Sequence, residues 1–158
     1  MAVITIAREL GAGGSSVAAM LARQLGAELV DRQLVAEVAR LMGLPADRVA
    51  AEEERARSVV DRLIRSSAWA GSVYAAGGDS SSGSLLADPQ QAVRALTEEI
   101  IRDSARRGNA IIVGRAGATV LAGWPDALHV FLHAAEPTRV REIMARFAVT
   151  EEEARRRV

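Results

Sequence analysis

The chain has 158 residues, the size of a single domain, and its 20 acidic residues balance 20 basic ones. This balance argues against a nucleic acid or an anionic membrane as the partner. The absence of cysteine excludes disulfides and thiolate metal sites. No apolar run reaches the ~18 residues of a membrane span, and the N-terminus lacks the pattern of a signal peptide. We therefore expect a cytoplasmic protein.

Hydrophobic periodicity predicts strands that alternate with helices. The predicted strands are 2–7, 28–30, 110–113 and 127–132, and the predicted helices are 15–25, 33–42, 46 to about 70, 89–107, 137–147 and 151 onward. Residues 71–87 are rich in Gly and Ser, which indicates a flexible loop. The alternation predicts one α/β domain, 1–158, with a parallel sheet between two layers of helices.

The first strand leads into a glycine-rich turn, which is followed at once by a helix. This order is typical of phosphate binding, because small residues let the backbone curl around an anion and the first N–H groups of the helix point at it. An ordinary tight turn is the alternative interpretation. The residues expected to contact phosphates are Gly11, Ala12, Gly13, Gly14, Ser15 and Ser16.

The loop departs from the standard phosphate-loop pattern, because the chain contains no lysine. One alignment places Arg8 at the first glycine of the pattern, Gly14 at the lysine and Ser16 where a hydroxyl would face Mg²⁺. A shift by one residue places Glu9 at the first glycine and Ser15 at the lysine instead. Arg8 could supply the missing positive charge, or it could form a surface pair with Glu9.

Arg115 follows a buried strand and a glycine. Ligands of open α/β sheets bind at the carboxyl ends of strands, and arginine can hold a phosphate with two parallel hydrogen bonds. Arg115 is therefore predicted to bind phosphate, with an ordinary surface arginine as the alternative. Asp31 and Arg32 also follow a strand, and Asp31 could simply cap the next helix.

Four stretches of this chain resemble the cytidylate kinase-like family, a branch of the nucleoside monophosphate kinases. They are 4–14 (ITIARELGAGG), 30–34 (VDRQL), 111–115 (IIVGR), and 129–132 (HVFL) with 136–140 (EPTRV). They have the family's order and spacing and span nearly the whole chain. In this branch the loop commonly reads S-R-E-x-G-x-G-G, so the missing lysine is partly a trait of the branch.

The resemblance implies a phosphate-loop NTPase-like fold with ATP and Mg²⁺ as cofactors and nucleotides as partners. It implies that Asp31, Arg32 and Arg115 bind the monophosphate substrate, although Ala116 stands where ordinary members have an aspartate. It also implies that 139–158 begins an arginine-rich lid. Arg139 and Arg146 would then act with Arg8 on the transferring phosphoryl group, while solvated helix faces are the alternative for these arginines.

Two functional hypotheses follow. The first is phosphoryl transfer from ATP to a pyrimidine monophosphate such as CMP, and the second is a nucleotide-binding protein without kinase activity. The family has a fifth strand and a terminal helix, which this sequence lacks, and lid arginines are expected beyond Arg157. Because these arginines and the loop lysine are missing, we expect this chain to be a weak catalyst or none. The missing strand leaves a sheet edge unpaired, which the partner subunit of a homodimer could cover.

Overall fold

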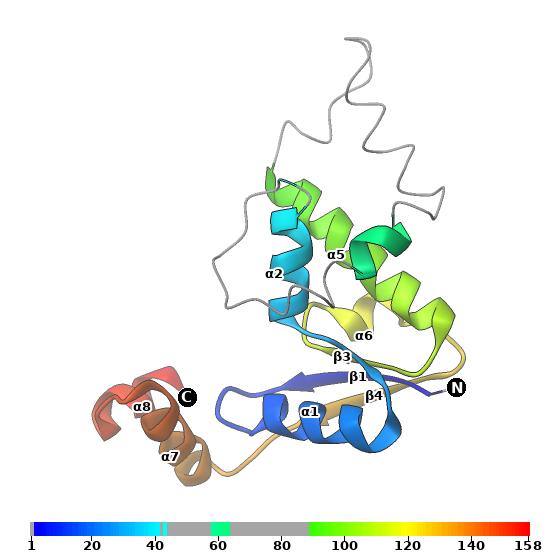
Figure 1. Ribbon diagram of the computed structural model, residues 1–158. Coiled ribbons are helices and arrows are strands. Elements are labelled where there is room, and N and C mark those ends of the chain that lie inside the picture. Colours follow the sequence, from blue (N-terminus) through cyan, green and yellow to red (C-terminus); the bar gives the residue numbers. More distant parts are fainter. Residues whose placement is uncertain (1, 42, 44–57, 64–88) are drawn as a thin grey trace. The chain divides into compact units, whose positions relative to one another are not determined.

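The computed structural model of the chain describes residues 2–41, 43, 58–63 and 89–158. One sheet contains the strands β1 (Val3–Arg8), β2 (Glu28–Val30), β3 (Ala110–Val113) and β4 (Ala127–Leu132), in the order β2-β3-β1-β4. β1 lies between β3 and β4 and pairs in parallel with both (Figure 1). The predicted α/β fold with a parallel sheet is confirmed, and each predicted strand lies within one residue of its expected position.

The described helices are α1 (Gly14–Leu25), α2 (Arg32–Leu41), α5 (Pro89–Arg107), α6 (Gly117–Val120), α7 (Glu136–Phe147) and α8 (Glu151–Arg157). Residues 58–63 are also helical, while the rest of the predicted helix 46–70 and the predicted loop 71–87 lie outside the described residues. The sequence did not predict α6, because four residues are too few for a helical period. None of the described helices is both long and apolar enough to cross a membrane.

The chain divides into two compact units, Met1–Leu29 with Arg107–Val158, and Val30–Arg106. In the first unit, one face of the sheet is covered by α1. Ile4 and Ile6 on β1 align with Ile111 and Val113 on β3, and these side chains form a buried core with Ala18 and Ala22 of α1. Partly buried Leu21 of α1 also packs against this core, so both small and large side chains of the helix cover the sheet.

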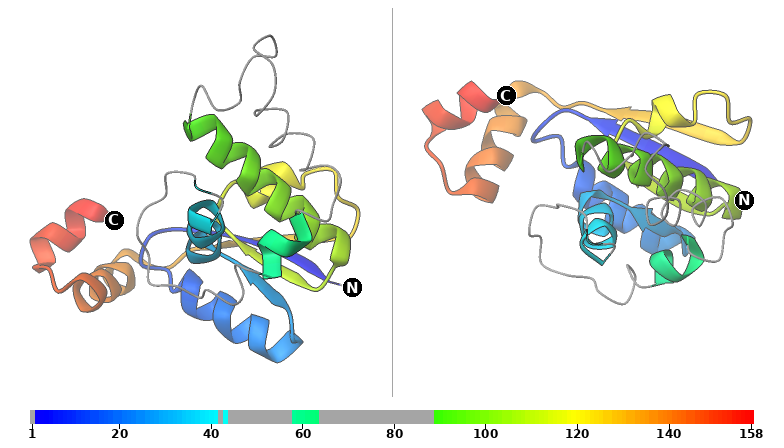
Figure 2. Two further views of the ribbon diagram at one scale, coloured as in Figure 1. Left: turned by 45° about the horizontal axis from the view of Figure 1, so that its top comes forward. Right: turned by 90° about the horizontal axis from the view of Figure 1, so that it is seen from above.

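The opposite face of β1 and β3 carries Thr5 and Ile112, and α6 begins against it (Figure 2). A Cβ atom on Gly117 would lie 2.6 Å from Ile112 Cγ2 and 3.7 Å from Thr5 Cγ2. The close approach therefore requires glycine at the first residue of α6. Thr5 is buried, and its hydroxyl forms a 2.8 Å hydrogen bond with His129 Nδ1 on β4.

α7 and α8 form a helical hairpin with a small core of its own. Val140 and Ile143 of α7 are buried together with Ala154 of α8. Thr150 caps α8 by accepting a 3.3 Å hydrogen bond from the N–H of Glu153, as its capping-box sequence predicts. The hairpin is therefore stabilised by its own local contacts.

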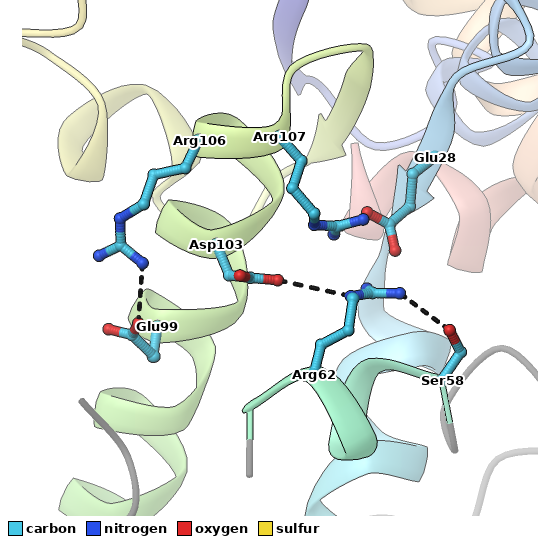
Figure 3. Close-up of polar contacts among 7 residues, drawn as sticks. All are labelled: Glu28, Ser58, Arg62, Glu99, Asp103, Arg106 and Arg107. Atoms are coloured by element: carbon cyan, nitrogen blue, oxygen red, sulfur yellow. Dashed lines mark hydrogen bonds and ion pairs between the residues drawn. The ribbon is translucent and has the colours of Figure 1, made fainter. Parts of the chain in front are cut away.

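In the second unit, a polar contact joins the helical segment 58–63 to α5 (Figure 3). Arg62 Nε lies 3.6 Å from Asp103 Oδ2, and Arg62 Nη1 donates to Ser58 Oγ at 3.0 Å. α5 begins at Pro89 and ends at Arg107 before Gly108, as the sequence predicts. The capping residue predicted for its start, Asp88, lies outside the described residues.

Candidate phosphate-binding site

The glycine-rich loop joins β1 to α1 and is shaped by two left-handed residues. Gly11 has φ +83° and Gly13 has φ +73°, values that glycine adopts without strain. The N–H of Ala12 donates to Glu9 O at 3.2 Å and closes the turn. A Cβ atom on Gly13 would meet no atom within 4 Å, so the loop is open to an approaching ligand on this side.

The first turn of α1 has free backbone donors. α1 has no side-chain cap and no acidic residue in its first turn. Within the described part of the chain, the N–H groups of residues 13–16 form no hydrogen bond, whereas the next N–H, of Val17, donates to Gly13 O at 3.0 Å. By contrast, Asp31 caps α2 and Thr150 caps α8. The beginning of α1 therefore offers converging donors to an anion.

Arg8 extends across the carboxyl ends of β1 and β3. Its aliphatic stem lies against Gly14, where an added Cβ atom would come within 2.7 Å of Arg8 Cγ. Its guanidinium lies against Gly114, because a Cβ atom there would overlap Arg8 Nη1. Because Gly14 and Gly114 have no side chains, there is room for Arg8, and its guanidinium lies at the sheet edge beside the loop.

The backbone after β3 is strained. Gly114, Arg115 and Ala116 are consecutive left-handed residues, with φ values of +67°, +55° and +56°. This conformation costs roughly 1–2 kcal/mol for a residue with a Cβ atom, and such strain is concentrated at functional sites. The turn places Arg115, whose side chain is exposed, directly after the glycine that contacts Arg8.

Glu9 does not form the alternative surface pair with Arg8. Its Oε2 atom lies 3.5 Å from Arg139 Nε and accepts a 3.3 Å hydrogen bond from the N–H of Ala134. Arg8 forms no hydrogen bond or ion pair with any described residue. The charge of Arg8 is therefore unpaired among the described residues, whereas Glu9 contacts Arg139 and Ala134.

A family model described as the cytidylate kinase-like family matches residues 3–158. The chain belongs to this family. No curated protein sequence matches it. Among solved structures, it is similar to an uncharacterized protein from Eubacterium ventriosum, with a TM-score of 0.62, 21% identity and coverage of 98% of this chain and 66% of that one. A protein from Thermus thermophilus aligns with a TM-score of 0.48 and 20% identity over 99% of this chain and 78% of that one. The chain thus spans less than two thirds of the first of these structures.

Membership in the cytidylate kinase-like family gives a context for the remaining predicted residues. Asp31 belongs to the second unit, where its Oδ1 accepts a 2.9 Å hydrogen bond from the N–H of Leu34. The capping role proposed for Asp31 is therefore confirmed, and its role toward substrate stays a prediction. Arg32 is the exposed first residue of α2, and its predicted contact with nucleotide also stays untested.

The two predicted lid arginines of α7 have different surroundings. Arg139 is mostly buried, contacts Glu9, and donates from Nη1 to Val158 O at 3.3 Å. The guanidinium of Arg146 lies 5.5 Å from the centre of the Phe147 ring. Arg146 forms no hydrogen bond or ion pair with any described residue. The structure therefore brings Arg139 to the loop and provides no polar contact between the loop and Arg146.

Ser15 and Ser16 are exposed in the first turn of α1, where their hydroxyls are accessible to a ligand. Among the described residues, no group of three or more His, Asp or Glu side chains is arranged to hold a metal. An exposed hydroxyl beside free backbone N–H groups nevertheless fits Mg²⁺, which usually keeps several waters and is bound through substrate phosphates. Ser16 remains the predicted protein ligand.

Sequence reasoning missed the role of Gly114 and the contact between Glu9 and Arg139. Gly114 stood within a recognised motif, but only the structure shows that Arg8 occupies the space a side chain would fill. Glu9 and Arg139 are far apart in the sequence, and no local pattern links them. The positive φ of Arg115 and Ala116 was equally unpredictable, because neither residue type favours it.

Proposed function

We propose that the chain binds the phosphates of ATP at residues 11–16 and transfers the terminal phosphoryl group to a pyrimidine monophosphate such as CMP. The position of Arg8 carries this proposal. Its guanidinium lies at the sheet edge without a described partner, next to an uncapped helix start. An anion bound here would accept hydrogen bonds from backbone N–H groups and would also face the full positive charge of Arg8. Membership in the cytidylate kinase-like family supports nucleotides as the ligands.

Phosphoryl transfer depends mainly on the positioning of the reacting groups and on neutralisation of the negative charge of the phosphates. The N–H groups of residues 13–16 would hold the donor phosphates, and Arg8 would supply the charge that a lysine supplies in ordinary phosphate loops. Ser16 would hold Mg²⁺, which would supply positive charge against the phosphates. Arg115, after the strained turn, would hold the phosphate of the acceptor with a bidentate contact.

Substitution of Arg8 by methionine tests the proposal while keeping much of the aliphatic stem. A hydrogen bond to a charged group contributes about 1.5–3 kcal/mol, so ATP should bind Arg8→Met roughly ten- to a hundredfold more weakly. The matched control is Arg23→Met, which removes an exposed arginine from the last turn of α1, the helix that follows the loop. Isothermal titration of both variants should show a loss only at Arg8. Equal affinities in the two variants would contradict the proposal.

The alternative is a nucleotide-binding protein without kinase activity, and the absence of lysine from the loop favours it. Coupled measurement of ADP formation with CMP, UMP, AMP and GMP separates the two. Kinase activity should appear with one pyrimidine monophosphate and fall in Arg8→Met. ATP binding without ADP formation from any acceptor would favour the alternative.

A further inference from the structure

The phosphate-binding loop is attached to the start of α7 through Glu9. The backbone N–H of Glu9 donates to Leu132 O at 3.0 Å, at the end of β4. Its carboxylate accepts from the N–H of Ala134 and faces the guanidinium of Arg139 through the same oxygen, Oε2. One residue of the loop therefore contacts the segment between β4 and α7 with both its backbone and its side chain.

A second contact lies two residues further along the loop. Gly11 packs against the backbone of Arg139 so closely that a Cβ atom on Gly11 would lie 2.6 Å from Arg139 O and 2.8 Å from Arg139 Cα. Figure 1 shows α7 and α8 beside the turn between β1 and α1. The loop and the beginning of α7 are therefore in direct backbone contact, and a movement of the loop toward α7 would displace α7 as well.

Arg139 extends the connection to α8. Its side chain is only 14% exposed, and its Nε atom is buried without a hydrogen-bond partner among the described residues. Its Nη1 atom donates to Val158 O, just after the end of α8. A buried guanidinium is costly unless a counter-charge lies near, and Glu9 supplies that charge.

We propose that Glu9 is a positioning residue that couples phosphate binding in the loop to the order of the α7–α8 hairpin. This inference rests on the proposed function of the loop. An anion that binds the N–H groups of residues 13–16 fixes the loop, and the loop then fixes α7 through Glu9 and Gly11. Since such coupling is reciprocal, an ordered hairpin raises the affinity of the loop for phosphate by the same factor.

Hydrogen exchange in the full chain, with and without saturating Mg²⁺-ATP, measures the coupling. In the wild type, ATP should slow amide exchange in residues 136–157 at least severalfold. Glu9→Ala removes the carboxylate, so the slowing in this segment should disappear and ATP affinity should fall about fivefold or more. Glu9→Gln keeps an acceptor for the Ala134 N–H but loses the charge, so it should retain part of the coupling.

Glu136→Gln is the matched control, because it also removes a carboxylate near the start of α7. Glu136 pairs with Arg155 of α8 at 3.1 Å and has no polar contact with the loop among the described residues. In Glu136→Gln, ATP should slow amide exchange in residues 136–157 as much as it does in the wild type. The control therefore separates a general loss of charge on the hairpin from loss of the contact that Glu9 makes.

The outcomes distinguish this inference from the proposed function. If the wild type binds ATP and the exchange of residues 136–157 does not change, the coupling is refuted while nucleotide binding stands. If Glu9→Ala lowers stability without ATP but retains the slowing by ATP, Glu9 is merely structural and the proposal is wrong. If the wild type binds no ATP, the proposed function fails and the coupling fails with it.

Discussion

Gly11→Ala is the substitution that most directly tests how the loop is built. Its φ of +83° costs an alanine about 1–2 kcal/mol. In addition, the new methyl group would lie 2.6 Å from Arg139 O and 2.9 Å from Arg139 Cβ, so the start of α7 must move by several tenths of an ångström. Overpacking of this kind costs typically 1–3 kcal/mol. We expect Gly11→Ala to lower the free energy of unfolding by about 2–5 kcal/mol in total.

Gly13→Ala is the matched control for this prediction. Gly13 lies in the same loop with a similar φ of +73°, but a Cβ atom there meets nothing within 4 Å. Both substitutions reduce the entropy of the unfolded chain equally, so this contribution cancels in the comparison. Gly13→Ala should therefore cost only the backbone strain, about 1–2 kcal/mol.

Urea unfolding followed by far-ultraviolet circular dichroism gives the two free energies, and the difference between them measures the contact of Gly11 with α7. We expect Gly11→Ala to be less stable than Gly13→Ala by about 1–3 kcal/mol. Equal destabilisation by the two alanines would refute the reasoning, because it would mean that the loop and α7 do not touch in solution.

Three further predictions concern Arg115 and two residues with positive φ, Ala148 and Ala116. Arg115→Met should weaken CMP binding about ten- to a hundredfold and leave ATP binding nearly unchanged in calorimetry, whereas equal losses for both ligands would place Arg115 outside the acceptor site. Ala148 ends α7 in an exposed left-handed conformation with φ +52°, so Ala148→Gly should stabilise the chain by about 0.5–1 kcal/mol in thermal unfolding. Ala116→Gly should stabilise it similarly but weaken CMP binding, because the backbone that orients Arg115 becomes freer; unchanged CMP affinity would show that the strain has no part in binding.

The local elements of this protein could be predicted from short stretches of its sequence. The apolar run 3–6, the glycines after it and the period of the following helix fixed the order of β1, loop and α1, and Gly26 and Thr150 marked the ends of helices as expected. These features depend on hydrogen bonds and torsion angles within a few residues, so the printed sequence contains the information needed to predict them. The arginine after β3 was identified in the same way, from a strand, a glycine and a guanidinium in succession.

The contacts of the polar side chains of the loop depend instead on how distant strands pair in the sheet. Arg8 reaches its place because β3 lies beside β1 and ends in Gly114. Glu9 contacts Arg139 because β4 lies on the other side of β1, and α7, which follows β4, therefore begins beside the loop. Both contacts follow from the strand order β2-β3-β1-β4, which brings residues more than a hundred positions apart to one edge of the sheet. Pairing between distant strands depends on the packing of the whole domain, and therefore no local pattern in the sequence reveals it.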